Sequence, residues 1–213
     1  MTVRRRLVSV LVAFIAPLLA SGCQQIFTYS PLTFLQRPPA TLPPEARLTY
    51  AEDALASGDK DAMKTAYDAI KDDTGTDASY TTAQLGIELS GVPTLLLKVA
   101  TDTSAVTSDL DNISGFISDN GLDPAYLVDA ASRLQAVDAS VDLTPTDYAM
   151  GALGLLLGQA QNTTPPWDIT NPSVDTTPAI DFFAKAVDGA ASLPDSDPLK
   201  AFISSFDTYL TGL

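Results

Sequence analysis

The sequence predicts an all-α fold of about nine helices, and three observations lead to this prediction. Apolar residues recur three and four positions apart from about residue 45 onward, the spacing of helices with one buried face. At four expected helix starts, a proline follows an Asp or Thr, a pair that suits the start of a helix. No segment shows the two-residue alternation of a convincing strand.

The first three helices are expected between residues 46 and 90. They cover Ala46–Ser57, Lys60–Asp72 and Tyr80–Ser90, and Gly58-Asp59 forms the turn between the first two. Their apolar faces are Leu48-Ala51-Leu55, Met63-Ala66-Tyr67-Ile70 and Tyr80-Ala83-Ile87.

Two further helices are expected before residue 120. One follows the turn at Gly91-Val92-Pro93, and the other covers Ser104–Ser118. Their apolar residues, again at helical spacing, are Leu95, Leu96, Val99 and Ala100, then Val106, Leu110, Ile113 and Ile117.

The last four helices share one type of start. Asp123, Thr144, Thr177 and Asp197 are the expected N-cap residues, and each is followed by proline. Asp147 lies three residues after Thr144, which predicts an approximate capping box with Asp in place of Glu. The faces are Leu127-Ala130-Leu134-Val137, Tyr148-Ala152-Leu155-Leu156, Phe183-Ala186-Val187-Ala190 and Leu199-Phe202-Ile203-Phe206-Leu210.

The helix expected after Pro145 is the most apolar of the set. Gly154 and Gly158 lie four residues apart in it, a step between small residues that permits close helix approach. Its apolar run is too short to span a membrane. We expect a buried central helix; the alternative is a helix that lines an apolar groove.

Residues 1–22 have the organisation of a secretory signal. Arg4, Arg5 and Arg6 precede an apolar segment, Leu7–Leu19, that is too short for a membrane span. Small residues then precede the only cysteine of the chain, Cys23. The run Leu19-Ala20-Ser21-Gly22-Cys23 resembles the lipobox of bacterial lipoproteins. Ala20 departs from that pattern, in which Leu is commoner at this position.

The lipobox resemblance implies a lipid anchor on Cys23. In this family the cysteine carries a diacylglycerol thioether and an amide-linked acyl chain, and two or more chains give stable membrane attachment. Gln24, where Asp would imply retention at the inner membrane, favours the outer membrane by the same resemblance. The expected organisation is a signal peptide over 1–22, a lipidated cysteine and Pro-rich tether over 23–44, and an all-α domain over 45–213.

Turn glycines recur at Gly58, Gly91 and Gly121, which are 33 and 30 residues apart. Small and aromatic packing residues surround each of them, so the stretch from Ala46 to Val137 resembles degenerate tetratricopeptide repeats. The full residue pattern of that repeat is not present. An irregular helical bundle stays open as the alternative, and helix pairs would stack in either case.

Composition removes most catalytic chemistry. The chain has no histidine, and its one cysteine is assigned to the lipid. Without the three signal arginines, nine basic residues face 26 acidic ones, a net charge of −17. This charge argues against nucleic-acid binding. Asp109 and its acidic neighbours do not have the spacing of a calcium-binding EF-hand loop. We therefore expect no enzyme, no cofactor and no metal site.

Location and architecture together predict a function. We expect a lipoprotein of the outer membrane, facing the periplasm, that acts as an adaptor or scaffold for a protein partner in an envelope assembly, secretion or transport complex. The alternative is a lipoprotein that presents a small molecule or lipid to a transporter. Trp167, the only tryptophan, lies in a Pro-rich loop and is the candidate partner-binding residue; alternatively, it covers one end of the helix stack.

Overall fold

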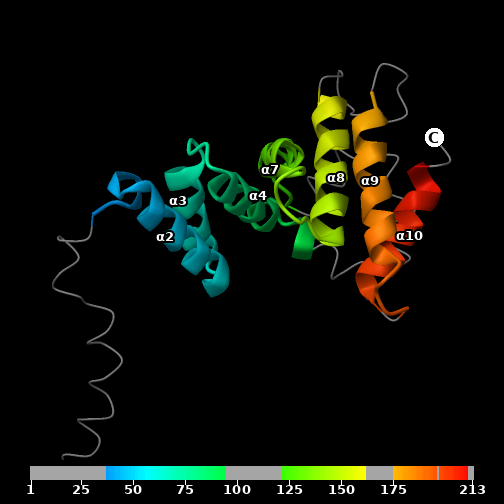
Figure 1. Ribbon diagram of the computed structural model, residues 1–213, viewed down its shortest axis with the longest axis horizontal. Coiled ribbons are helices and arrows are strands. Elements are labelled where there is room, and N and C mark those ends of the chain that lie inside the picture. The colour runs from blue at the N-terminus through cyan, green and yellow to red at the C-terminus, as the bar shows by residue number, and fades with distance from the viewer. Residues whose placement is uncertain (1–36, 95–120, 162–174, 196, 211–213) are drawn as a thin grey trace, which may run out of the picture. The chain divides into compact units, whose positions relative to one another are not determined.

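The computed structural model describes residues 37–94, 121–161, 175–195 and 197–210, and these residues confirm the all-α prediction (Figure 1). They form one short 3₁₀ helix and seven α-helices, and no strand occurs among them. The elements are η2 (Pro39–Thr41), α2 (Pro44–Ser57), α3 (Lys60–Ile70), α4 (Thr76–Ser90), α7 (Pro124–Val137), α8 (Pro145–Gln161), α9 (Thr177–Ala190) and α10 (Pro198–Leu210).

By its internal contacts the chain divides after Thr41. All seven α-helices belong to the second unit, Leu42–Leu213. Within the described part of the chain, no helix is long and apolar enough to cross a membrane. The helices predicted around Leu95 and over Ser104–Ser118 lie outside the described residues.

Three of the four predicted Asp-Pro and Thr-Pro helix starts are as expected. Asp123 accepts a hydrogen bond from the Ala125 N–H at 3.1 Å. Asp197 accepts one from the Leu199 N–H at 2.9 Å. These bonds satisfy amide groups that a first helical turn leaves without an intrahelical acceptor.

The predicted capping box at the start of α8 is also confirmed. The Asp147 N–H donates to Thr144 Oγ1 at 3.2 Å, and the Thr144 N–H donates to Asp147 Oδ2 at 2.9 Å. This reciprocal pair satisfies two amide groups at once, and Asp is long enough to replace Glu in it.

The predicted starts of α4 and α9 were wrong. α4 begins at Thr76 rather than Tyr80; its N-cap is Gly75, which has no capping side chain. Ala78 is buried, so packing holds this first turn. In α9 the N-cap is Thr176, and Thr177 is already helical. Asp175 accepts the Thr177 N–H at 3.1 Å, so an acidic residue replaces the expected threonine cap.

The C-terminal helices pack around α8. α8 contacts α7 on one side and α9 on the other, and α9 also contacts α10 (Figure 1). A helix with neighbours on two sides must be apolar over most of its circumference. The α8 sequence meets this requirement, and the buried central helix expected from the sequence is observed. Its buried residues are Asp147, Ala149, Met150, Gly151, Ala152, Gly154, Leu156, Leu157 and Ala160.

A second, smaller core lies among the N-terminal helices. α2 and α3 contact each other and both contact α4. Every residue of the predicted α3 face is buried in this core. Its buried members are Ala51, Ala54, Met63, Ala66, Tyr67, Ile70 and Leu85. α4 belongs to both cores, since its Leu85 enters the small one whereas Ala83 and Ile87 enter the larger one.

Gly86 permits the contact of α4 with α7. A Cβ atom at Gly86 would lie 2.9 Å from the Tyr126 carbonyl oxygen and 3.1 Å from Ala130 Cβ. Both distances are shorter than ordinary packing contacts, so only glycine allows the two helices to approach this closely. Residues far apart in sequence thereby form one continuous hydrophobic core.

Candidate functional site

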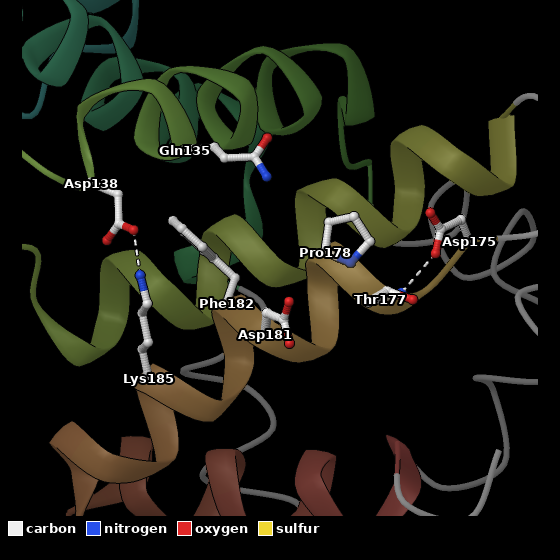
Figure 2. A pocket seen from close by; sticks show the side chains of 8 residues that line it. All are labelled: Gln135, Asp138, Asp175, Thr177, Pro178, Asp181, Phe182 and Lys185. Carbon is white, nitrogen blue, oxygen red and sulfur yellow. Dashed lines mark hydrogen bonds and ion pairs between the residues drawn. The ribbon is translucent and has the colours of Figure 1, made fainter.

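The described residues form an open groove of about 480 Å³ between α7 and α9 (Figure 2). Gln135 lies on the α7 side, and Asp138 follows the last residue of α7. Most of the other lining residues belong to α9 or directly precede it. The full lining is Gln135, Asp138, Asp175, Thr177, Pro178, Asp181, Phe182 and Lys185.

Lys185 lies at one end of the groove. Its ammonium group forms an ion pair with Asp138, drawn as a dashed line in Figure 2. The same Nζ lies 5.6 Å from the ring centroid of Phe182 and 5.4 Å from that of Tyr148. Both distances are within the range of cation–π attraction. The groove therefore already surrounds one cation with a carboxylate and two aromatic rings.

Tyr148 joins this arrangement through its hydroxyl group. It donates a hydrogen bond to Asp138 Oδ1 at 2.7 Å, and its ring packs edge-on against Phe182 at 5.1 Å between centroids. The hydrogen bond from Lys185 lowers the pKa of Asp138 below its usual range, with a further contribution from Tyr148. Burial, together with the neighbouring Asp138 carboxylate, raises the pKa of Tyr148 to about 12. Asp138 is thus an anion and Tyr148 a neutral donor at neutral pH.

The remaining acidic groups line the rest of the groove. Asp181 is exposed and has no ion pair or side-chain hydrogen bond within the described part of the chain. Asp175 is exposed, and its only described interaction is with the Thr177 N–H. Neither carboxylate forms an ion pair with a Lys or Arg among the described residues. The Pro178 ring and the largely buried ring of Phe182 also line the groove.

This arrangement suits a cationic group with an apolar stem. Carboxylates attract the charge, whereas ring carbons accept the methylene groups of a long basic side chain. Among the described residues, no group of three or more acidic side chains is placed to hold a metal ion.

A second polar cluster lies inside the larger core. Asp147 is 3% exposed. Its carboxylate accepts hydrogen bonds from the N–H and the hydroxyl group of Thr144. It also accepts hydrogen bonds from the Tyr80 hydroxyl at 3.1 Å and from Gln84 Nε2 at 2.9 Å. Burial and the carboxylate raise the pKa of Tyr80 to about 12, so Tyr80 is a donor at neutral pH. Every donor has an acceptor here, and the cluster joins α4 to the start of α8.

A third polar cluster joins α3 to α7. The Tyr67 hydroxyl donates to Asp129 Oδ2 at 2.7 Å, and Arg133 Nε donates to the same oxygen, also at 2.7 Å. The Arg133 guanidinium also donates to the Lys71 carbonyl at 2.7 Å. Burial, followed by the bond to Asp129, raises the pKa of Tyr67 well above its usual range. Like the Asp147 cluster, this one connects helices that are distant in sequence.

The two site residues predicted from the sequence lie outside the described part of the chain. Cys23 precedes the first described residue, and Trp167 falls between α8 and α9. The groove was not predicted. A signal for it was present, because Pro178, Asp181, Phe182 and Lys185 have the i, i+3, i+4, i+7 spacing of one helix face. The apolar spacing of α9 instead predicted Phe183 as part of its buried face.

Comparison with known proteins gives no relative for this chain. No family model matches the sequence, no curated protein matches it, and no solved structure matches it.

Proposed function

We propose that this chain is a lipoprotein of the bacterial outer membrane, facing the periplasm, whose helical body is an adaptor or scaffold for an envelope protein. The observation that carries the proposal is the Leu19–Cys23 run, directly after three arginines and an apolar segment. It supplies both an export signal and a site for the lipid. Bacterial lipid anchors hold such bodies at the membrane surface.

The architecture of the body supports protein binding. Gly58, Gly91 and Gly121 all have left-handed backbone conformations, with φ of 67°, 81° and 62°. The first two end α2 and α4, as expected for turn glycines between stacked helices. We propose that the N-terminal helices form a degenerate tetratricopeptide-like stack, an architecture that recognises other proteins. The open groove between α7 and α9 adds a surface that a partner can reach.

The anchor is tested by Cys23→Ser in the full chain. We expect this variant to incorporate no radiolabelled palmitate and to move from the membrane fraction to the soluble periplasmic fraction. Ser21→Ala is the matched control, since it exchanges one small residue for another and should leave both results unchanged. Normal lipid incorporation and membrane fractionation of Cys23→Ser would overturn the lipoprotein proposal.

The adaptor role is tested by crosslinking in intact cells, followed by capture of the full chain from solubilised membranes. We expect one protein, or a small set, to be enriched over an unrelated lipoprotein at the same expression level. Trp167→Ala measures whether the tryptophan contributes to the contact. Recovery of no specific protein under crosslinking conditions would contradict the adaptor role.

The alternative function, presentation of a lipid or small molecule, would use an apolar groove along Tyr148–Gly158. α8 packs closely in this region. Cβ atoms at Gly151 and Gly154 would lie 2.7 Å from Phe182 Cδ1 and 2.6 Å from Ala131 Cβ. This packing favours a structural role for these glycines. A stoichiometric ligand found by native mass spectrometry of the full chain would favour the alternative.

A further inference from the structure

We propose that the groove between α7 and α9 binds a basic side chain, arginine or lysine, from an extended segment of the partner protein. This inference rests on the proposed adaptor function and adds the chemical class of the partner segment. The cationic head would pair with Asp181, Asp175 would add negative charge further along the groove, and the methylene stem would lie on Pro178 and Phe182 (Figure 2).

Lys185 is a cation that already lies in the groove, and its contacts show which groups bind positive charge there. Lys185 pairs with Asp138 and lies over two aromatic rings at 5.4 and 5.6 Å. The same helix places Asp181 one turn before Lys185 and one turn after Pro178, and all three side chains line the groove. A second cation that entered from solvent would find the Asp181 carboxylate here, with the Pro178 ring on the same helix face. Its head would lie close to a carboxylate and its stem would cover ring carbon.

The charge of the groove selects a cation over an anion. Three of its eight lining residues are aspartates and one is a lysine. That lysine is paired with Asp138, whereas Asp175 and Asp181 have no ion pair within the described residues. The mature chain carries −17 overall, so the long-range field also attracts basic segments. A volume of about 480 Å³ is within the range of sites that hold small groups.

The occupant is a peptide side chain rather than a metal ion. The carboxylates are spread along the groove, and no three acidic groups of the described chain are placed for metal coordination. Calcium and magnesium require several oxygen ligands around one point. A guanidinium or ammonium group on a long stem needs only one or two carboxylates and an apolar surface beside them.

The test measures binding of a capped pentapeptide, Leu-Arg-Leu-Arg-Leu, to the full-length chain in detergent by fluorescence anisotropy. The variant Asp175→Asn/Asp181→Asn keeps the side-chain shapes and the amide acceptor for Thr177. We expect this variant to weaken binding about tenfold. The matched control, Asp53→Asn/Asp188→Asn, changes two exposed aspartates outside the groove by the same net charge. It should change the affinity less than about twofold.

A second pair of variants tests the position on α7. Gln135→Lys introduces a competing cation opposite Asp181, and Ala136→Lys introduces the same charge next to it on the same helix, outside the groove lining. We expect only Gln135→Lys to reduce binding markedly. The same peptide with citrulline in place of arginine should not bind, because it has no positive charge.

The outcomes distinguish this inference from the function on which it rests. Equal loss of binding in the groove and control variants, or no binding of the arginine peptide, overturns the groove proposal even if crosslinking recovers a partner. If Cys23→Ser still incorporates palmitate and stays in the membrane, the lipoprotein proposal fails independently of the peptide result. Peptide-induced shifts in the amide NMR spectrum that avoid residues 135–138 and 175–185 would also overturn the groove proposal.

Discussion

The carboxylate of Asp147 is the most deeply buried acidic group of the described residues, and no described cation contacts it. Four neutral donor groups of Tyr80, Gln84 and Thr144 replace the water that it loses on folding. A buried charge without such donors would cost several kcal/mol. Because these donors come from both α4 and the α8 start, one side chain links two helices that are distant in sequence.

Replacement of Asp147 by alanine should destabilise the chain by about 2–4 kcal/mol, because it removes the acceptor of four hydrogen bonds and leaves the partly buried Tyr80 hydroxyl without an acceptor. Urea unfolding followed by circular dichroism measures the change. Asp188→Ala, at an exposed position in α9, is the control and should change stability by less than about 0.5 kcal/mol. Equal effects of the two substitutions would show that the Asp147 cluster contributes nothing.

Asp138 should make stability depend on acidity. Its folded-state pKa is lowered, chiefly by the bond from Lys185, so its unfolded-state pKa of about 3.9 is the higher one. As the pH falls, the unfolded chain therefore binds the proton first. The stability contributed by Asp138 is present above about pH 4 and is lost as the pH falls through the folded-state pKa.

The variant Asp138→Asn should be less stable than the wild type at neutral pH, and the difference should shrink as the pH falls below about 4. Urea midpoints measured across this range provide the test. Asp188→Asn is the control, since no ion pair of Asp188 is described. A difference between wild type and Asp138→Asn that stays constant over the whole range would contradict the assignment.

At the scale of the element, α8 shows what a small residue contributes when both sides of a helix are covered. A Cβ atom at Gly154 would lie 2.6 Å from Ala131 Cβ and still closer to the Leu127 carbonyl oxygen. A Cβ atom at Gly158 would meet only the Val128 side chain, at 3.2 Å. The two glycines thus look alike in sequence, but one opposes a rigid backbone and the other a side chain that can move.

Gly154→Ala should destabilise the chain by about 1–3 kcal/mol, because overpacking against backbone exceeds the gain in helix propensity. Gly158→Ala should be neutral or slightly stabilising, since Val128 can shift by a few tenths of an ångström. Thermal and urea unfolding of the two variants measure the contrast. If Gly158→Ala were the more damaging substitution, the packing of α7 against α8 would differ from that described.

At the scale of the folded body, the described residues of the second unit have two hydrophobic cores of unequal size. The larger contains residues of α4, α7, α8, α9 and α10, and the smaller contains residues of α2, α3 and α4. The smaller core contains fewer buried apolar side chains than the larger one, so less apolar burial stabilises it. Groups of residues that unfold together in local opening commonly coincide with such separate cores.

Amide hydrogen exchange should therefore be faster in α2 and α3 than in α8 and α9. Met63→Ala, which removes a side chain that is 3% exposed in the smaller core, should accelerate exchange in α2 and α3 and leave α8 nearly unchanged. Leu134→Ala in the larger core is the matched control and should affect α7 to α9. Equal acceleration throughout the described helices by both variants would indicate a single cooperative unit.

Features that depend on neighbours within one or two helical turns could be predicted from the sequence. Apolar spacing predicted the helices, and Asp123, Thr144 and Asp197 marked three of their starts because an N-cap acts on amides two or three residues away. α4 was predicted to start too late, since its first turn is held by the burial of Ala78 rather than by a cap. The proposed lipid anchor at Cys23 likewise depends on a short local run.

Which helix faces are covered, and where a groove remains, depends on how the helices pack in three dimensions. α9 packs against both α8 and α10, so Phe182 and Phe183 are both buried although they point in different directions. The groove exists because α7 and α9 both pack against α8 and bring Asp138 next to Lys185, 47 residues later in the chain. Helix periodicity specifies the face of each helix. It does not specify the partner, because the free energy of burial depends on apolar area and shape rather than on sequence order.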